Sequence, residues 1–393
     1  MFKFYSNFPK TEHNIIPNLL LKNNEIKYLI PKTFSFLPKT FSSFVLNMYF
    51  CKMGDVTLKD LAEALEISVA TVSKALKNYS DVSPSTKKRV KELAETLNYT
   101  PNSLAVNFRT KESKTIGLII PEVVHHFFSN IIKGIIAQAE KKGYLVIILQ
   151  SNESYKLEKK QLDLLVSKRV DGVLMTLSNG TANYKHINAV LDRDIPLILF
   201  DKTAKLVNCS KVIINDRKAA FIAVEHLIKS GCKRIAHFRG PLLPLNSIDR
   251  FLGYKKALET YNIQYDPSLV YTCKDVSFEE GSDFTQDLIN KKSNVDGIFT
   301  VSDLVAIGAI AKLNELKIKI PEQISVIGFS NWFMSSAITP SLTTIDQPGY
   351  LMGKKAFKRL FKEMTKVKNK EPYKYKTIEV PTSLVVRNST KKF

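Results

Sequence analysis

The chain has 393 residues, so at roughly 150 residues per domain we expect two or three folded units. Apolar residues make up 44% of it and charged residues 24%, a balance that excludes collagen-like, mucin-like and wholly disordered proteins. The 58 Lys and Arg residues outnumber the 37 Asp and Glu residues and give a formal net charge of +21. Such an excess favours an anionic partner, either nucleic acid or an acidic membrane surface.

The cysteines and the apolar runs exclude further classes of protein. Cys51, Cys209, Cys232 and Cys273 lie far apart without a Cys-x-x-Cys pair, so the sequence indicates neither a zinc ribbon nor a dithiol redox site. A reducing cytosol is the simplest compartment for such a chain. No run approaches the ~18 consecutive apolar residues of a membrane-spanning helix, and the apolar segment 41–51 lacks the small residues of a signal-peptide cleavage site.

Residues 1–53 form a segment apart from the rest. They show no helical or strand period, and prolines recur along them. We expect this extension to be disordered or not translated, in which case Met53 begins the native protein.

Residues 54–99 contain three short amphipathic helical patterns. Thr57 is a candidate N-cap of the first, with Asp60 placed for a capping box. Ser68 is placed to cap a second helix over 69–76, after a very short turn. Pro84 stands at the first position of a third, which runs to about residue 97. Two brief helices across a tight turn, supported by a third, predict a helix-turn-helix domain, although spacing alone leaves a purely structural helical hairpin open.

Beyond a linker at 100–113, apolar β-branched runs alternate with amphipathic helical segments. This strand–helix repetition predicts parallel sheets with helices on both faces, in two lobes. The predicted strands are 116–120, 146–149, 173–175, 197–200, 212–214, 298–301 and 325–329. The predicted helices are 130–142, 159–168, 219–229, 250–261 and 304–316.

Four linked sequence blocks resemble the DNA-binding head of the lactose-repressor/galactose-repressor (LacI/GalR) family of bacterial transcription regulators. The resemblance then continues through the chain to about residue 390. It implies an all-α helix-turn-helix head at 54–99, a hinge at 100–113, and an α/β effector-binding and dimerisation domain at 114–393. That domain would consist of two doubly wound parallel-sheet lobes of the type I periplasmic-binding-protein-like class. The blocks are VTLKDLAEA (56–64), ISVATVSKALKN (67–78), VSPSTKKRV (82–90) and LNYTPN (97–102).

The resemblance implies that the second helix enters the major groove of DNA. Val69 and Ala70 match base-reading positions but offer only apolar contacts, whereas Lys74 can donate to guanine or phosphate. The remaining positions that match DNA-contacting or capping residues are Thr57, Ser68, Thr71, Ser73 and Asn78.

The linker carries a second expected DNA contact. In the family it forms a hinge helix whose apolar side chain wedges into the minor groove, and Phe108 matches that position, where leucine is usual. Asn102 and Ala105 fit the same pattern, whereas Val106 stands where arginine is common. Packing of Phe108 between head and core is the structural alternative.

For the effector site, the segment Arg250-Phe-Leu-Gly-Tyr254 resembles the family's ligand-binding Arg-x-x-Gly motif. A guanidinium that opens a helix suits bidentate capture of sugar hydroxyls or a carboxylate. Ser330 stands where the family usually has an effector-binding Asp, which puts a standard hexose pose in doubt. The other expected effector residues fall at strand ends or on a sugar-stacking aromatic position, although Asp also caps helices there: Phe127, Asp201, Asp275, Ser302 and Asp303.

These observations predict a DNA-binding transcription regulator, a repressor by resemblance, without a cofactor or a metal site. Its expected partners are a pseudo-palindromic operator in double-stranded DNA, a small effector such as a sugar, and a second copy of the chain, with no membrane. A sugar-binding transport protein with the same core fold is the alternative, and an enzyme would need a constellation that the sequence hides. The excess positive charge is not located in the predicted DNA-binding head, since the net charge is +1 over 53–112 and +10 over 351–393.

Overall fold

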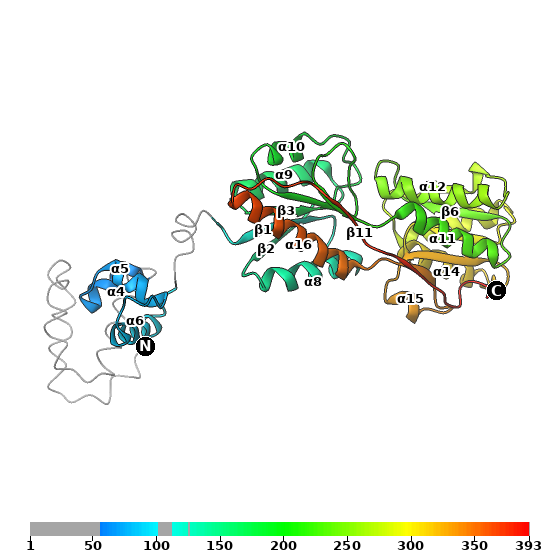
Figure 1. The fold of residues 1–393 in the computed structure, drawn as a ribbon. Helices are drawn as coiled ribbons and strands as arrows, with labels where there is room; N and C mark the ends of the chain where they lie inside the picture. Colours follow the sequence, from blue (N-terminus) through cyan, green and yellow to red (C-terminus); the bar gives the residue numbers. More distant parts are fainter. Residues whose placement is uncertain (1–55, 101–111, 125, 393) are drawn as a thin grey trace, which may run out of the picture. The chain divides into compact units, whose positions relative to one another are not determined.

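The structure, a computed structural model, describes residues 56–100, 112–124 and 126–392. The chain divides into two compact units, residues 1–111 and 112–393 (Figure 1). The predicted extension at 1–53 and most of the predicted hinge lie outside the described residues. Among the described residues, none of the helices has the length and apolar character needed to cross a bilayer.

The described part of the first unit, residues 56–100, contains three helices, α4 (Leu58–Leu65), α5 (Val69–Leu76) and α6 (Pro84–Thr96). The predicted caps are confirmed. Thr57 and Asp60 form a capping box, and the Ser68 hydroxyl accepts a hydrogen bond from the amide of Thr71. The helices enclose a small core because one side of each is apolar, and its fully buried members include Leu61, Val72, Ala75 and Val90.

The second unit begins with lobe 1, a six-stranded parallel sheet in the order β11-β5-β4-β3-β1-β2. Alternate residues of its strands face two apolar layers, one under α8 and α16 and the other under α9 and α10. Its strands are β1 (Thr115–Ile120), β2 (Leu145–Gln150), β3 (Gly172–Met175), β4 (Leu197–Phe200), β5 (Ser210–Ile213) and β11 (Thr377–Glu379). Its helices are α8 (His126–Glu140), α9 (Tyr155–Ser167), α10 (Lys185–Leu191) and α16 (Gly349–Lys368).

Lobe 2 repeats this plan with the strand order β12-β10-β9-β8-β6-β7, in which only β12 runs antiparallel to its neighbour. Helices α11 and α12 cover one face, and α13 and α14 cover the other. Its strands are β6 (Ile235–Arg239), β7 (Val270–Thr272), β8 (Gly297–Thr300), β9 (Ser325–Ser330), β10 (Thr343–Asp346) and β12 (Ser383–Val385). Its helices are α11 (Asp216–Lys229), α12 (Leu245–Thr260), η2 (Pro267–Leu269), α13 (Phe278–Asn290), α14 (Asp303–Glu315) and α15 (Met334–Ala337).

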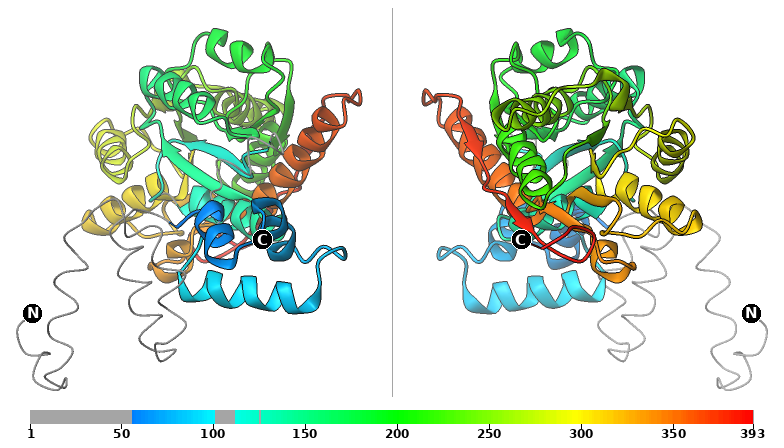
Figure 2. Two further views of the ribbon diagram at one scale, coloured as in Figure 1. Left: turned by 90° about the vertical axis from the view of Figure 1, so that its left-hand side faces the viewer. Right: turned by 90° about the vertical axis from the view of Figure 1, so that its right-hand side faces the viewer.

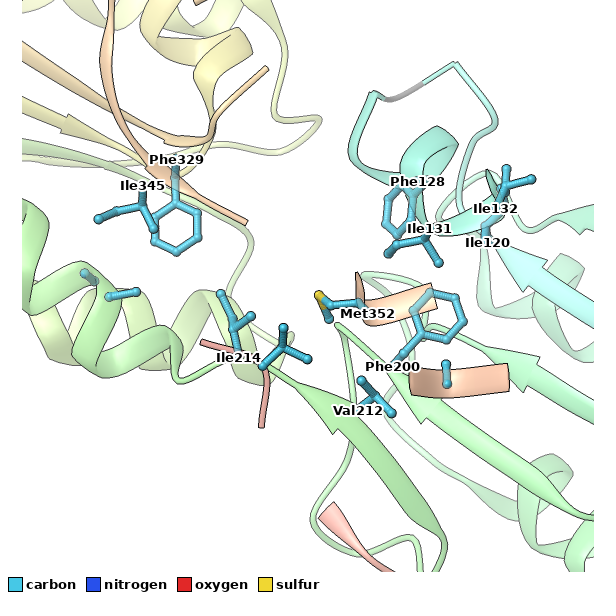
Figure 3. Close-up of a cluster of buried hydrophobic side chains, with 14 of the residues drawn as sticks. Ile120, Phe128, Ile131, Ile132, Phe200, Val212, Ile214, Phe329, Ile345 and Met352 are labelled. Atoms are coloured by element: carbon cyan, nitrogen blue, oxygen red, sulfur yellow. The ribbon is translucent and has the colours of Figure 1, made fainter. Parts of the chain in front are cut away.

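The chain passes between the lobes at three places, from β5 to α11, from β10 to α16 and from β11 to β12. An apolar cluster follows these connections and joins the lobes. Figure 3 shows Ile214, which follows β5, between Phe329 and Ile345 of lobe 2 and Phe200 and Met352 of lobe 1. The predicted doubly wound, two-lobed architecture is therefore confirmed, and each lobe turns the carboxyl ends of its parallel strands toward these connections.

One sequence expectation needs correction, and one long helix was not predicted. The helix expected to open at Arg250 begins at Leu245, so Arg250 lies in its second turn and not at its N-terminus. No element was predicted after residue 329, yet this part of the chain contains the longest helix described, α16, whose apolar side packs on α8.

Glycines permit the close packing of the helix pairs. A Cβ atom at Gly308 of α14 would lie 2.0 Å from the backbone oxygen of Phe278 in α13, and one at Gly353 of α16 would lie 2.2 Å from that of Ile131 in α8. Neither backbone oxygen can move without moving its helix. Gly308 therefore sets the distance between α13 and α14 in lobe 2, and Gly353 sets the distance between α8 and α16 in lobe 1.

We expect Gly308→Ala to lower the free energy of unfolding by about 1–3 kcal/mol, because α13 and α14 must separate to admit the methyl group. Gly180→Ala is the matched control, since a Cβ there meets only the backbone oxygen of Glu153, 3.9 Å away. Urea unfolding of the two variants measures the difference. Equal stabilities would contradict the packing argument.

Candidate functional site

Helix α5 presents two apolar side chains and one cation to solvent. Val69 is 44% exposed, and Ala70 and Lys74 are exposed beside it. Val72 and Ala75 point the other way and are fully buried, as their spacing predicted. This surface offers methyl groups and one ammonium donor, which suits contact with thymine methyl groups and with guanine or phosphate.

Lys74 does not project freely in this structure. Its ammonium donates to the carboxylate of Asp81, 2.5 Å away, and both side chains are about half exposed. The hydrogen bond to Lys74 lowers the pKa of Asp81, and the same bond raises the pKa of Lys74. Any DNA phosphate or base that takes up Lys74 therefore competes with Asp81.

Of the other expected DNA-contacting residues of the head, some are exposed and some use their side chains to cap helices. Thr57 and Ser68 are exposed but their hydroxyls cap helices, and Thr71 and Ser73 are half-buried. Asn78 is exposed, with φ +61, where its backbone ends α5. Asn102, Ala105 and Phe108 lie outside the described residues, so their expected hinge contacts stay predictions.

Arg250 stands on α12 of lobe 2 and is buried, only 6% exposed. Its Nε donates to Asp216 Oδ1 at 2.8 Å and its Nη1 to the carbonyl oxygen of Val301 at 2.8 Å. The guanidinium carbon stands 3.7 Å above the centre of the Phe329 ring. Contacts from α11, from the residue that follows β8 and from β9 thus fix the orientation of this side chain, and sequence reasoning had not paired it with Asp216.

Asp201 follows β4 and belongs to the facing edge of lobe 1. It is buried, and its Oδ1 accepts only a long hydrogen bond of 3.4 Å, from Gln347 in the connection between β10 and α16. Burial raises the pKa of Asp201, against the opposing charges of Arg250 and Lys202. The structure therefore brings Asp201 of one lobe within electrostatic range of Arg250 and Asp216 of the other.

A polar network that sequence reasoning missed lies beside Asp201. The ammonium of Lys202, almost buried, donates to Glu153 and, at 2.9 Å, to Asn179. The backbone N–H of Asn179 in turn donates to the carboxylate of Glu153 at 2.7 Å. All three residues follow strands of lobe 1, and this position after a strand is the feature by which the sequence could have revealed them. The network neutralises Lys202 locally and leaves Asp201 as a weakly bonded carboxylate at this edge.

Asp303 is fully buried and serves the interior of lobe 2. Its carboxylate accepts hydrogen bonds from the amide of Trp332 at 2.6 Å and from the hydroxyls of Ser335 and Thr344 at 2.7 and 2.5 Å. Burial raises the pKa of Asp303, and these three donors oppose that rise. The residue thus anchors the segment that carries Trp332, and its expected contact with an effector stays a prediction.

The backbone before Trp332 is held in an unusual conformation. Ser330 has φ +122, a region that residues with a Cβ rarely adopt. The next side chain, Asn331, secures the turn, because it donates to Asp346 at 2.8 Å and accepts from Arg387 at 2.7 Å. The largely exposed Phe333 reaches His126 of lobe 1, with the ring centres 5.9 Å apart, and the Trp332 ring packs edge to face on Phe333 at 5.5 Å.

The remaining expected effector residues lie on α8 and after strands of lobe 2, and their contact with an effector stays a prediction. Phe127 is half-buried on α8 beside Phe128, and Ser302 caps α14 through its hydroxyl. Asp275 is exposed in the loop between β7 and α13. Within the described ranges, no group of three His, Cys, Asp or Glu side chains could hold a metal ion.

Comparison with known proteins identifies the family. The model of the bacterial regulatory proteins, lacI family, matches residues 57–102, and that of the periplasmic binding protein-like domain matches residues 224–390. The ribose operon repressor of Halalkalibacterium halodurans is 33% identical over 336 residues, which are 85% of this chain and 97% of that protein. The chain belongs to the lacI family.

Other members of the lacI family agree over most of the chain. The transcriptional repressor CytR of Escherichia coli K12 is 35% identical over 310 residues, 78% of this chain and 89% of CytR. A crystal structure of the lac repressor dimer, bound to operator and an anti-inducer, matches with a TM-score of 0.76 and 27% identity. The match covers 86% of this chain and 100% of the lac repressor chain. The predicted family and fold are confirmed, and the protein is a DNA-binding transcription regulator of this family.

We expect Asp303→Asn to loosen the segment 331–336, because a neutral amide cannot accept all three hydrogen bonds. Trp332 is the only tryptophan of the chain, so its fluorescence reports on this segment alone. Emission should move to longer wavelength, and the free energy of unfolding should fall by about 1–3 kcal/mol. The exposed Asp275→Asn is the control, and an Asp303→Asn spectrum identical to that of the control would contradict the anchoring role.

Proposed function

We propose that this protein is a repressor that binds a pseudo-palindromic operator as a homodimer and is controlled by a small neutral polyhydroxylated effector, such as a sugar. The effector would bind between the lobes, against Arg250 and Asp201. The observation that carries the proposal is that two buried side chains of opposite charge, Arg250 on α12 of lobe 2 and Asp201 after β4 of lobe 1, lie within electrostatic range of each other. Together they supply donors and an acceptor for hydroxyl groups.

The charges of this site favour a neutral effector over a phosphorylated one. Asp201 and Asp216 contribute two carboxylates, and Arg250 contributes one guanidinium that Asp216 already engages. Lys202 is close, but its ammonium is bound to Glu153 and Asn179. A phosphate would therefore meet the weakly bonded carboxylate of Asp201 without a free cation to balance it, whereas a hydroxyl can donate to Asp201.

Aromatic side chains support a ligand with a flat or apolar face. Trp332 and Phe333 stand on the anchored segment of lobe 2, and Phe127 stands on α8 of lobe 1. Sugar rings stack on such faces through their C–H groups. Because both lobes contribute contacts, an effector that binds one lobe arrangement more tightly than another shifts the population toward it, and with it the affinity for DNA.

The relatives support repression and an operator as the DNA partner. The ribose operon repressor and CytR are named as repressors, and the lac repressor structure contains a dimer on operator DNA. Since these relatives are regulators, we assign no catalytic activity to this chain. The regulator would act in the cytoplasm, where its DNA target lies.

Two variants of the head test how it binds DNA. Lys74→Gln should weaken binding and reduce the slope of log affinity against log salt concentration by about 0.9, as expected when one phosphate is no longer neutralised. Asp81→Asn should strengthen binding, because it removes the carboxylate that holds Lys74. Fluorescence anisotropy on an operator selected from randomised duplexes measures both. Equal affinities for both variants and the wild type would mean that Lys74 does not contact DNA.

The effector site is tested by thermal shift and Trp332 fluorescence of the full chain with D-ribose, disaccharides, nucleosides and D-ribose 5-phosphate. A neutral compound should raise the melting temperature and change operator affinity, whereas the phosphate should do neither. Arg250→Lys and Asp201→Asn should each weaken that response by roughly tenfold or more and leave operator binding without effector intact. A response unchanged in both variants would exclude this site, and a response to the phosphate alone would exclude a neutral effector.

A further inference from the structure

The chain enters lobe 1 through a strongly basic surface that the effector site does not use. We define this entry face by six lysines from three segments: Lys114, Lys141, Lys142, Lys366, Lys368 and Lys370. They stand before β1, after α8 and at the end of α16. The strands of lobe 1 begin at this edge, opposite the edge that carries Asp201.

Contacts between the three segments fix the entry face as one surface. Glu112, the first residue of the second unit, lies 2.7 Å from the ammonium of Lys368 and 3.1 Å from that of Lys114. Figure 1 shows the end of α16 beside the start of β1, and Figure 2 shows the last turns of α16 projecting from lobe 1. The C-terminal tail and the hinge side of lobe 1 thus share one surface.

Two aromatic rings contact two of the six lysines. Tyr144 and Phe361 pack edge to face with their centres 6.1 Å apart, joining α16 to the loop after α8. The ammonium of Lys114 stands 4.8 Å from the centre of the Tyr144 ring, and that of Lys142 stands 5.0 Å from the centre of the Phe361 ring. Such contacts orient the lysine stems without neutralising their charges, and of these two lysines only Lys114 also has a carboxylate partner, Glu112.

The acidic residues nearby neutralise only part of this surface. Glu112 forms ion pairs with Lys114 and Lys368, and Glu371 is bound to Lys366. The carboxylate of Asp171 accepts a hydrogen bond from the backbone amide of Lys114 at 2.9 Å, and Glu363 is buried against Arg359. Among the carboxylates of the described residues, none forms an ion pair with Lys141, Lys142 or Lys370, all of which are exposed. The C-terminal ends of α8 and α16 also attract cations, but each carries the equivalent of only about half a negative charge. They therefore do not cancel the charges of these lysines.

The covalent connection keeps the entry face close to bound DNA. Residues 101–111 join the last described residue of the head, Thr100, to Glu112. Even a fully extended segment of this length spans at most about 40 Å. When the head is on its operator, the entry face is therefore present at high effective concentration near the neighbouring phosphates.

We propose that the entry face of lobe 1 binds the phosphate backbone of the DNA that flanks the operator. The nearly neutral head reads the base sequence of the operator. The effector domain adds contacts to phosphates, which strengthen binding whatever the DNA sequence is. This inference depends on DNA binding by the family and not on the identity of the effector, so failure of the proposed effector site leaves it unaffected.

The test compares two triple variants of the full chain that lose the same charge. In the first, Lys141→Gln, Lys142→Gln and Lys370→Gln remove the uncompensated cations of the entry face. In the control, Lys274→Gln, Lys292→Gln and Lys317→Gln remove three exposed lysines of lobe 2. Each is titrated with the selected operator alone and with the same operator lengthened by about 10 base pairs, one helical turn, on each side.

On the lengthened duplex, the entry-face variant should bind roughly tenfold more weakly than wild type, as expected for three exposed cations that bind phosphates. Its salt slope should be smaller by about 0.9 for each phosphate that the variant leaves without a lysine. On the operator alone it should match wild type, and the control should match wild type on both duplexes. Equal weakening in the two variants would mean that only net charge matters, and wild-type binding by the entry-face variant on the lengthened duplex would overturn the proposal. Circular dichroism and thermal unfolding of the variant verify that lobe 1 is folded.

Discussion

The ion pair between Arg250 and Asp216 is the interaction on which lobe 2 and the proposed effector site both depend. Two charges taken out of water are costly unless their hydrogen bonds are satisfied, and here the carbonyl of Val301 and the ring of Phe329 complete the surroundings of the guanidinium. The pair ties α12 to α11 and to two strands of the sheet. It also fixes one cation at the edge that faces Asp201, so the same contacts that hold the lobe together set the polarity of the site.

Much of this fold could be predicted from sequence because its elements bury one apolar side. The strand at 197–200 and the helix at 69–76 were predicted with the bounds that the structure has. Strand β6 was missed because His237 and Arg239 interrupt its apolar pattern; His237 is buried in an aromatic stack, where burial lowers its pKa to about 3 and keeps it neutral. Strand β10 was missed because its threonines find hydrogen-bond partners only in the folded sheet.

The site could be predicted in part, for a related reason. A parallel sheet places the ends of its strands at one edge, so Asp201 and Arg250 could be selected from the family motif and the strand pattern. Their partners could not, because Asp216 and Gln347 reach them from separate connections between the lobes. Asp303 shows the opposite limit. Its position after a strand resembles that of a ligand residue, yet the folded lobe surrounds its carboxylate with donors that lie 29 to 41 residues away in the chain.

The three passages of the chain between the lobes have a consequence for biosynthesis. Lobe 1 acquires its first five strands by residue 213, but one of the two helices that cover one side of its sheet spans Gly349–Lys368, and its sixth strand ends at Glu379. Because the ribosome releases residues in order, an apolar layer of lobe 1 stays partly uncovered while all of lobe 2 except its last strand is synthesised. The two lobes therefore complete their folding together near the end of translation, and the nascent chain is a natural client for chaperones that shield apolar surface.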